Sequence, residues 1–326
     1  MDEYDEDSGQ KRRSGLILKI GRLLIQFFFF ILFGNLVFIF GYNILGGIAK
    51  YFNGFPLPIM QSHATPGTTI TGVFDVLMES ISHGLFFGLI LALGSLLLFG
   101  IIFGRATCGW VCPFGFVLDL CYYVPVRKRY PGIQINSQLS KVKFAIVILT
   151  FFIVIAFGLV VAGGGTPLPL GPFTDNPFSP IDPATTIQAV IPNLIMNPGA
   201  YGWPTLEEGF WNIFSWSPWF WFRVIFMVII LILCIYIARA WCRWFCPMGA
   251  MLGLLNPYAI VGVQRNVSKC LGKKCRTCEL ACPMGVPLLR EPWEKITHTN
   301  CILCMKCYEA CPEGAITLSF FQFKQT

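Results

Sequence analysis

Cysteine is the residue type whose number and spacing suggest chemistry in this sequence. The chain has 326 residues and 14 cysteines, and 12 of the cysteines fall in patterned groups. Eight of them lie near the C-terminus in two runs, CLGKKCRTCELACP and CILCMKCYEACP. Thiolates are strong ligands for metal ions and for metal–sulfur clusters. Both runs are therefore candidate metal-binding sites.

The spacing within these runs favours iron–sulfur clusters over zinc. Four-cysteine zinc sites commonly use two separated C-x2-C pairs. Here the second run is C-x2-C-x2-C-x3-C-P, the pattern with which bacterial proteins hold two [4Fe-4S] clusters, the fourth cysteine of each run serving the other cluster. We predict that one cluster is bound by Cys270, Cys275, Cys278 and Cys311. The other cluster is predicted on Cys301, Cys304, Cys307 and Cys282.

Four further cysteines belong to an internal repeat. GRATCGWVCPFGFVLDL, which begins at Gly104, aligns with ARAWCRWFCPMGAMLGL, which begins at Ala238. The shared C-x3-C-P phrases contain Cys108, Cys112, Cys242 and Cys246. If each phrase is helical, its two cysteines are neighbours on one helix face. Three interpretations remain open: a further iron–sulfur centre between the repeats, a redox-active thiol set, and a structural end to a membrane span.

The composition indicates a membrane protein. The chain is 55% hydrophobic and 13% charged, whereas soluble proteins carry about 25% charged residues. Runs of about 18 or more apolar residues are candidate transmembrane helices. Four such runs occur, at roughly Leu23–Leu45, Leu85–Phe103, Phe144–Ala162 and Trp219–Ile237. The net charge of +7 does not indicate nucleic-acid binding, because the basic residues lie beside the apolar runs.

The distribution of lysine and arginine predicts the orientation. Positive residues concentrate on the cytoplasmic side of membrane proteins, and here they cluster in the N-terminal tail and between the second and third runs. The segment 163–218 contains neither lysine nor arginine. We therefore expect both termini and both C-x3-C-P phrases on the cytoplasmic side of the inner membrane. Short interfacial helices are expected at GVFDVLMESI and ATTIQAVIPNLI, in the two outer loops.

These observations predict three regions. Residues 1–15 are expected to form a disordered tail, residues 16–255 a four-helix transmembrane domain, and residues 256–326 a cytoplasmic domain with two [4Fe-4S] clusters. The fold class is an α-helical membrane protein of two parallel two-helix repeats, with a C-terminal α+β ferredoxin-like domain.

The chain resembles the NapH-type membrane ferredoxins over nearly its whole length. GRATCGWVCPFGFVLDL and the outer segment NPFSP (176–180) are especially similar to that family. Related polyferredoxins are of the MauN, NosR and CcoG types. The resemblance implies a quinol dehydrogenase subunit associated with periplasmic nitrate reductase. It also implies partners, namely the quinone pool, a NapG-like ferredoxin-type subunit and a c-type cytochrome. The step from Cys270 to Cys275 departs from the usual spacing.

Three functions are considered from the sequence. The first is a quinol-oxidising electron-transfer subunit whose catalytic residues the sequence does not identify. The alternatives are a CcoG-like assembly or metal-reduction protein, and a non-catalytic anchor for a redox partner. The only histidines are His63, His83 and His298, which argues against a bis-histidine haem. Glu79, His83 and Asp119 are expected to be structural. Cys121 and Cys234 lie outside the patterns and are expected to be inert thiols.

Overall fold

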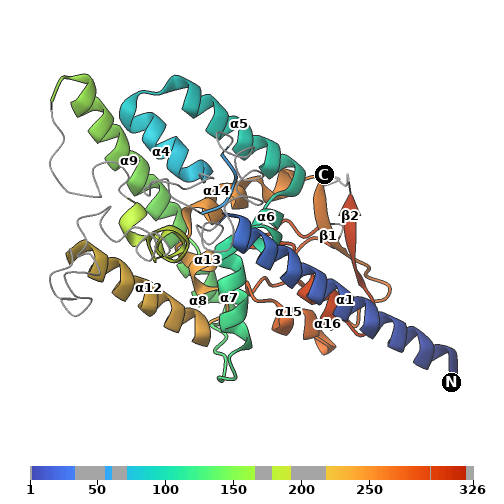
Figure 1. Ribbon diagram of the computed structural model, residues 1–326. Helices are drawn as coiled ribbons and strands as arrows, with labels where there is room; N and C mark the ends of the chain where they lie inside the picture. The colour runs from blue at the N-terminus through green and yellow to red at the C-terminus, as the bar shows by residue number, and fades with distance from the viewer. Residues whose placement is uncertain are drawn as a thin grey trace.

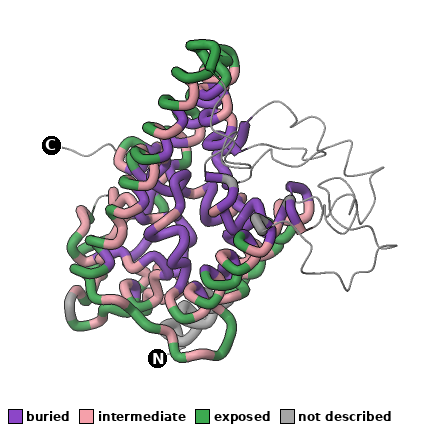
Figure 2. The backbone as a smooth tube through the Cα atoms, turned by 90° about the vertical axis from the view of Figure 1, so that its left-hand side faces the viewer, coloured by how far each residue is buried: buried purple, intermediate pink, exposed green. Residues whose placement is uncertain are grey.

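The fold is known from a computed structural model that describes residues 2–33, 56–60, 72–165, 178–191, 218–293 and 295–320. Its described elements are mostly helices, joined by one two-stranded sheet (Figure 1). Buried backbone runs through the middle of the molecule, and exposed backbone surrounds it (Figure 2). Six of the patterned cysteines are buried there, namely Cys108, Cys112, Cys242, Cys246, Cys278 and Cys304.

Three described helices are long and apolar enough to span a membrane, namely Gly15–Phe33, Phe86–Phe103 and Ile133–Ala162. The fourth expected span corresponds to a shorter apolar helix, Phe220–Tyr236, so four full spans are not established. The expected first span, Leu23–Leu45, continues past the described residues. Its described part belongs to α1 (Asp2–Phe33), which includes the segment expected to be a disordered tail. Acidic residues open this helix, where the helix dipole favours negative charge.

The internal repeat appears as two equivalent sets of three helices. The first set is α5 (Phe86–Phe103), α6 (Ala106–Trp110) and α7 (Pro113–Tyr123). The second set is α12 (Pro218–Tyr236), α13 (Ala240–Trp244) and α14 (Pro247–Leu255). In each set a long apolar helix is followed by a five-residue helix and then by a helix that begins at the proline of the C-x3-C-P phrase.

The C-x3-C-P phrases are not continuous helices, so the neighbour relation that a helical phrase would give its two cysteines does not apply. In each phrase the first cysteine lies in the five-residue helix, and the second is the N-cap of the next helix. The following proline occupies the first turn, where its missing N–H costs no hydrogen bond. Each second cysteine therefore sits at a helix N-terminus.

The described parts of the segments predicted to be outer loops pack against the long helices. Helix α4 (Val73–His83) buries Val73, Phe74, Leu77 and Met78 and packs against α5 and α9 (Val142–Ala162) (Figure 1). In the other loop the described residues form η2 (Ser179–Ile181), α10 (Pro183–Thr185) and η3 (Thr186–Val190). These three elements pack against α12. The expected interfacial helices are thus buried structure.

The C-terminal region has approximate twofold symmetry. Strands β1 (Val261–Arg265) and β2 (Ile316–Phe320) pair antiparallel, with Val261 opposite Phe320. Helices α15 (Thr277–Ala281) and α16 (Lys306–Ala310) follow the second cysteine of each run. Both helices are preceded by a left-handed residue, Arg276 in one and Met305 in the other. The remaining described helices are α8 (Ile133–Leu139), η7 (Asn256–Tyr258) and η8 (Gly272–Lys274).

Candidate iron–sulfur centres

The structure brings the twelve patterned cysteines together as three sets of four. The first tail set lines a cavity of about 360 Å³ and consists of Cys270, Cys275, Cys278 and Cys311. The second tail set lines a cavity of about 350 Å³ and consists of Cys282, Cys301, Cys304 and Cys307. The inter-repeat set lines a cavity of about 330 Å³ and consists of Cys108, Cys112, Cys242 and Cys246.

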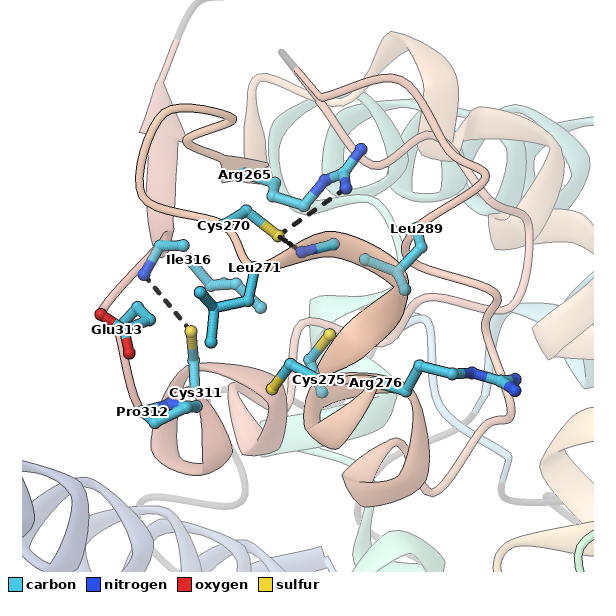
Figure 3. A pocket seen from close by; sticks show the side chains of 13 residues that line it. Arg265, Cys270, Leu271, Cys275, Arg276, Leu289, Cys311, Pro312, Glu313 and Ile316 are labelled. Atoms are coloured by element: carbon cyan, nitrogen blue, oxygen red, sulfur yellow. Dashed lines mark hydrogen bonds between the residues drawn. The ribbon is translucent and has the colours of Figure 1, made fainter.

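The first tail set lies close to the surface (Figure 3). Cys270 accepts hydrogen bonds through its Sγ from the Gly272 N–H at 3.4 Å and from Arg265 at 3.9 Å. The Sγ of Cys311 accepts from the Ala315 N–H at 3.3 Å. Backbone donors of this kind stabilise thiolate sulfur. Each of the two tail cavities is lined by three cysteines of one run and by the fourth cysteine of the other run. These are the two groups of four into which the sequence-based prediction divided the tail cysteines.

The second tail set is packed against the first repeat. A Cβ added to Gly109 in α6 would overlap the carbonyl oxygen of Ile302 and lie 3.7 Å from the Cα of Cys304. The Trp110 indole N–H donates to the Leu303 carbonyl at 2.9 Å. Arg22 of α1 donates to the Cys304 carbonyl at 3.0 Å. The loop that carries this set therefore touches the segment that carries Cys108.

The inter-repeat set is buried between the two repeats. Each of its four cysteines is at most 8% exposed. Burial raises the pKa of the Cys112 thiol and of the Cys242 thiol to about 12. Four adjacent thiolates at this buried place would need a compensating positive charge. Trp241 also lines the cavity, and its indole N–H has no partner among the described residues.

Two equivalent arginines hold the repeats together by crossing between them. Arg105 of the first repeat donates to the Cys242 carbonyl at 3.0 Å, and Arg239 of the second repeat donates to the Cys108 carbonyl at 3.1 Å. Both side chains are fully buried. A Cβ at Gly249 would lie 2.6 Å from Arg105 Nη2, which explains the glycine in the C-P-x-G phrase.

Asp119 connects four parts of the chain, and the spacing of residues gave no sign of this role. Its carboxylate accepts from Arg239 at 2.7 Å and from Lys306 at 3.4 Å, and it lies 3.5 Å from Arg22. Gln26 donates to the same carboxylate at 3.2 Å. Burial by itself would raise the pKa of Asp119, but Arg239, Lys306 and Arg22 outweigh it and hold the pKa below its usual range. The expectation that Asp119 is structural agrees with these contacts.

Residues 58–60 complete the wall of the inter-repeat cavity. Pro58, Ile59 and Met60 line it, although this segment was expected outside, between the first two spans. Leu57 accepts from the Val73 N–H at 2.8 Å, so the segment is joined to the start of α4. The outer loop is therefore re-entrant in its described part.

The other cysteines and candidate polar residues stand apart. Cys121 and Cys234 line none of the three cavities. His83 is exposed at the end of α4, and Glu79 is half-buried one turn before it. Among the described residues, no group of three or more His, Cys, Asp or Glu side chains is placed to hold a single metal ion.

Comparison with known proteins agrees with this arrangement. A family described as "4Fe-4S binding domain" matches residues 85–131 and again residues 219–265, which confirms the internal repeat. A family described as "4Fe-4S dicluster domain" matches residues 269–316. Each C-x3-C-P phrase lies within one match to the first family, and all eight cysteines of the two tail sets lie within 269–316. No solved structure is significantly similar to the chain.

Three relatives indicate the family. An uncharacterized protein of Methanocaldococcus jannaschii is 24% identical over 76% of this chain and 85% of its own. The ferredoxin-type protein NapH of Haemophilus influenzae is 23% identical over 68% of this chain and 65% of its own. The methylamine utilization ferredoxin-type protein MauN of Methylobacillus flagellatus is 22% identical over 71% of this chain and 66% of its own. With its repeated 4Fe-4S unit, its dicluster tail and its apolar helices, the chain is similar to the NapH-type ferredoxins, and these matches support an iron–sulfur electron-transfer protein.

Proposed function

We propose that this chain is the membrane-bound subunit of a quinol dehydrogenase and that it conducts electrons through three [4Fe-4S] clusters. The first tail set, the second tail set and the inter-repeat set each hold one cluster. When bound, each cluster takes up and gives off one electron at a time. Oxidation of one quinol to quinone releases two electrons and two protons, so the electrons leave the substrate in two successive steps.

The observation that carries the proposal is the contact between the second tail set and the inter-repeat set. Gly109 follows Cys108 directly, and it packs against Ile302 and Cys304. Arg105 bridges the same two sites, because it donates to the Cys242 carbonyl and, at 2.7 Å, to the Thr299 carbonyl. Two redox sites joined by packed atoms in this way suit electron transfer from the membrane unit to the tail.

The buried charges also suit anionic clusters. A cluster held by four thiolates carries net negative charge, and nearby charge helps set its reduction potential. Arg22, Arg105 and Arg239 each donate to the carbonyl of a proposed ligand. Lys143 is fully buried and donates to Asn300 Oδ1 at 2.5 Å, beside Cys301. Buried charges are stable only when they are paired, and the clusters supply the partners that Asp119 alone does not.

The proposal also includes the access of quinol, the orientation in the membrane and the partner proteins. Quinol reaches the chain from the bilayer through the apolar helices, and both termini face the cytoplasm. The partners implied by the family resemblance are a ferredoxin-type subunit and a c-type cytochrome that serve a periplasmic reductase such as nitrate reductase.

The test is anaerobic reduction of the purified protein in nanodiscs. Menaquinol or duroquinol is mixed with the oxidised protein, and loss of the visible iron–sulfur absorbance is followed. Because the direction depends on potential, the dithionite-reduced protein is also mixed with the matching quinone. We expect electron exchange in at least one direction. Protein that dithionite bleaches but that exchanges with neither quinol nor quinone would refute quinol oxidation.

A cysteine variant tests the route. Cys246→Ser removes one proposed ligand of the inter-repeat set and leaves both tail sets intact. We expect its tail clusters to remain reducible by dithionite while exchange with quinol is lost. Cys121→Ser is the matched control, because Cys121 lies outside the three cavities. Quinol exchange at the wild-type rate in Cys246→Ser would remove the inter-repeat set from the route.

A further inference from the structure

The two cysteine runs of the tail differ at one equivalent loop. Between its first two cysteines the second run has only Ile302 and Leu303, which are 2% and 6% exposed. As described above, that loop docks on α6. The first run has Leu271, Gly272, Lys273 and Lys274 at the same place. The departure from the usual spacing is therefore an insertion that ends in two lysines.

The inserted loop carries exposed side chains. Leu271 is 55% exposed, and Lys274 is also exposed. Gly272 has a φ of +62°, a left-handed conformation that glycine adopts without strain, and it lets the chain turn into η8. The Gly272 N–H reaches the Cys270 sulfur. The loop thus covers the first tail set with a short turn whose outer face is open (Figure 3).

The surface around this loop is cationic. Between Gly262 and Cys278 the sequence has five lysines and arginines and no aspartate or glutamate. Lys269, Lys274 and Arg276 are exposed, as are the apolar side chains of Val267 and Leu280. The carboxylates at the edge of this surface are Glu279, which pairs with Arg276 at 3.1 Å, and Glu313. We call the surface formed by Val267, Lys269, Leu271, Lys274, Arg276 and Leu280 the cationic port.

We propose that the cationic port is the docking site of a soluble one-electron carrier protein whose own redox centre is surrounded by acidic residues. The symmetry of the tail supports this occupant. The apolar loop over the second tail set contacts the segment of the inter-repeat set, and the equivalent loop over the first tail set is free to contact a separate carrier protein. A positive surface around a redox site steers an acidic partner toward it. The exposed apolar side chains supply the centre of the contact.

This inference goes beyond the proposed function, because it needs a cluster at the first tail set but not quinol oxidation. With the cationic port, the chain has a second site at which it exchanges electrons with a partner, and this site lies on the tail. Electrons then pass between the membrane unit and the soluble carrier through the second tail set.

The experiment measures electron transfer from a reduced acidic 2[4Fe-4S] ferredoxin to the intact protein in nanodiscs of uncharged lipid, by stopped flow. We expect the second-order rate constant to fall steeply as salt is raised from about 0.01 to 0.3 M, since salt screens exposed charges. The double variant Lys269→Glu/Lys274→Glu should slow the reaction about tenfold or more at low salt. Reduction by dithionite should be unchanged, which shows that the clusters are intact.

The matched control is Arg127→Glu/Lys141→Glu. These two side chains are also exposed cations but lie outside the cationic port. We expect this control to react at nearly the wild-type rate. Equal slowing in both double variants, or a wild-type rate that does not depend on salt, would overturn the proposal. If the port variant loses affinity for vesicles with phosphatidylserine but reacts with ferredoxin normally, the surface binds lipid headgroups and the proposal is wrong.

The quinol test and this test fail independently. A protein that exchanges electrons with quinol but shows no port effect retains the proposed function and loses this inference. A protein with a port effect but no quinol exchange shows the reverse.

Discussion

Asp119→Asn tests whether one buried carboxylate joins the parts of this protein. The substitution keeps the shape of the side chain but removes its negative charge and puts an NH2 group among positive donors. It leaves Arg239 and Arg22, which are at most 1% exposed, and Lys306 without their shared anion. Removing one partner of a buried ion pair costs about 3–5 kcal/mol, because the remaining charge stays buried.

The corresponding loss of thermal stability is measurable. At about 2–4 °C per kcal/mol for a domain of ordinary size, a loss of about 3–5 kcal/mol lowers the melting temperature by roughly 6–20 °C, which is followed by intrinsic tryptophan fluorescence in detergent. Since the pKa of Asp119 is lowered in the fold, its contribution is fully present above the ordinary aspartate pKa and is lost only as pH falls through the folded pKa. The difference between variant and wild type should therefore be the same at pH 6 and at pH 8.

A control and a double variant complete the test. Glu279→Gln removes the charge from a pair with Arg276, whose side chain is 56% exposed, and ion pairs open to solvent contribute only about 0–1 kcal/mol. In Asp119→Asn/Arg239→Gln the loss should be smaller than the sum of the two single losses, because the pair is removed together. A melting temperature for Asp119→Asn within about 1 °C of wild type would show that the clusters, and not Asp119, balance the buried cations.

Three further predictions follow from the described contacts. Cys108→Ser should lower the iron content by about four atoms per chain in an anaerobic metal assay, whereas Cys121→Ser should leave it unchanged; equal iron in both would remove the inter-repeat cluster. Arg105→Gln should shift the midpoint potential of that cluster to more negative values in an EPR-monitored titration, because a positive charge beside Cys242 is lost; Arg127→Gln, an exposed cation, should not, and a potential that stays fixed in Arg105→Gln would contradict the role of Arg105. Gly109→Ala should weaken the packing of the tail by about 1–3 kcal/mol, because the added Cβ overlaps Ile302, and this is measured as faster proteolysis after Val261. Gly94→Ala, whose Cβ meets no atom within 4 Å, should not change the proteolysis rate. Similar proteolysis of both variants would mean that the overlap at Gly109 is relieved by a shift elsewhere.

Much of the candidate site was predictable because iron–sulfur ligands are read from local spacing. The division of the tail cysteines between two cavities follows from the rule that the fourth cysteine of each run serves the other site. The internal repeat was visible because its two copies keep the same residues in order. These features need no knowledge of how distant segments pack. The assignment of the twelve cysteines as ligands remains a prediction.

The rest depends on contacts that no local pattern contains. Asp119 and Arg239 are 120 residues apart, and nothing near either residue names the other. An apolar segment such as 73–78 has the same composition whether it lies at a membrane surface or inside a protein, so α4 was expected at the interface. The C-x3-C spacing fits one helix, but the proline after the second cysteine starts a new helix and breaks the first.

The exchange of arginines between the repeats also bears on how the protein is made. Two cysteines of the inter-repeat set come from each repeat, and each arginine that braces this set reaches across from the other repeat. A nascent chain that has only its first repeat in the membrane contains Cys108 and Cys112 but not the other two cysteines of the inter-repeat set. Its Arg105 also lacks the Cys242 carbonyl to which it donates in the folded protein. Delivery of a cofactor to this place has to wait until synthesis has passed Cys246, which makes maturation of the centre a late event in biogenesis.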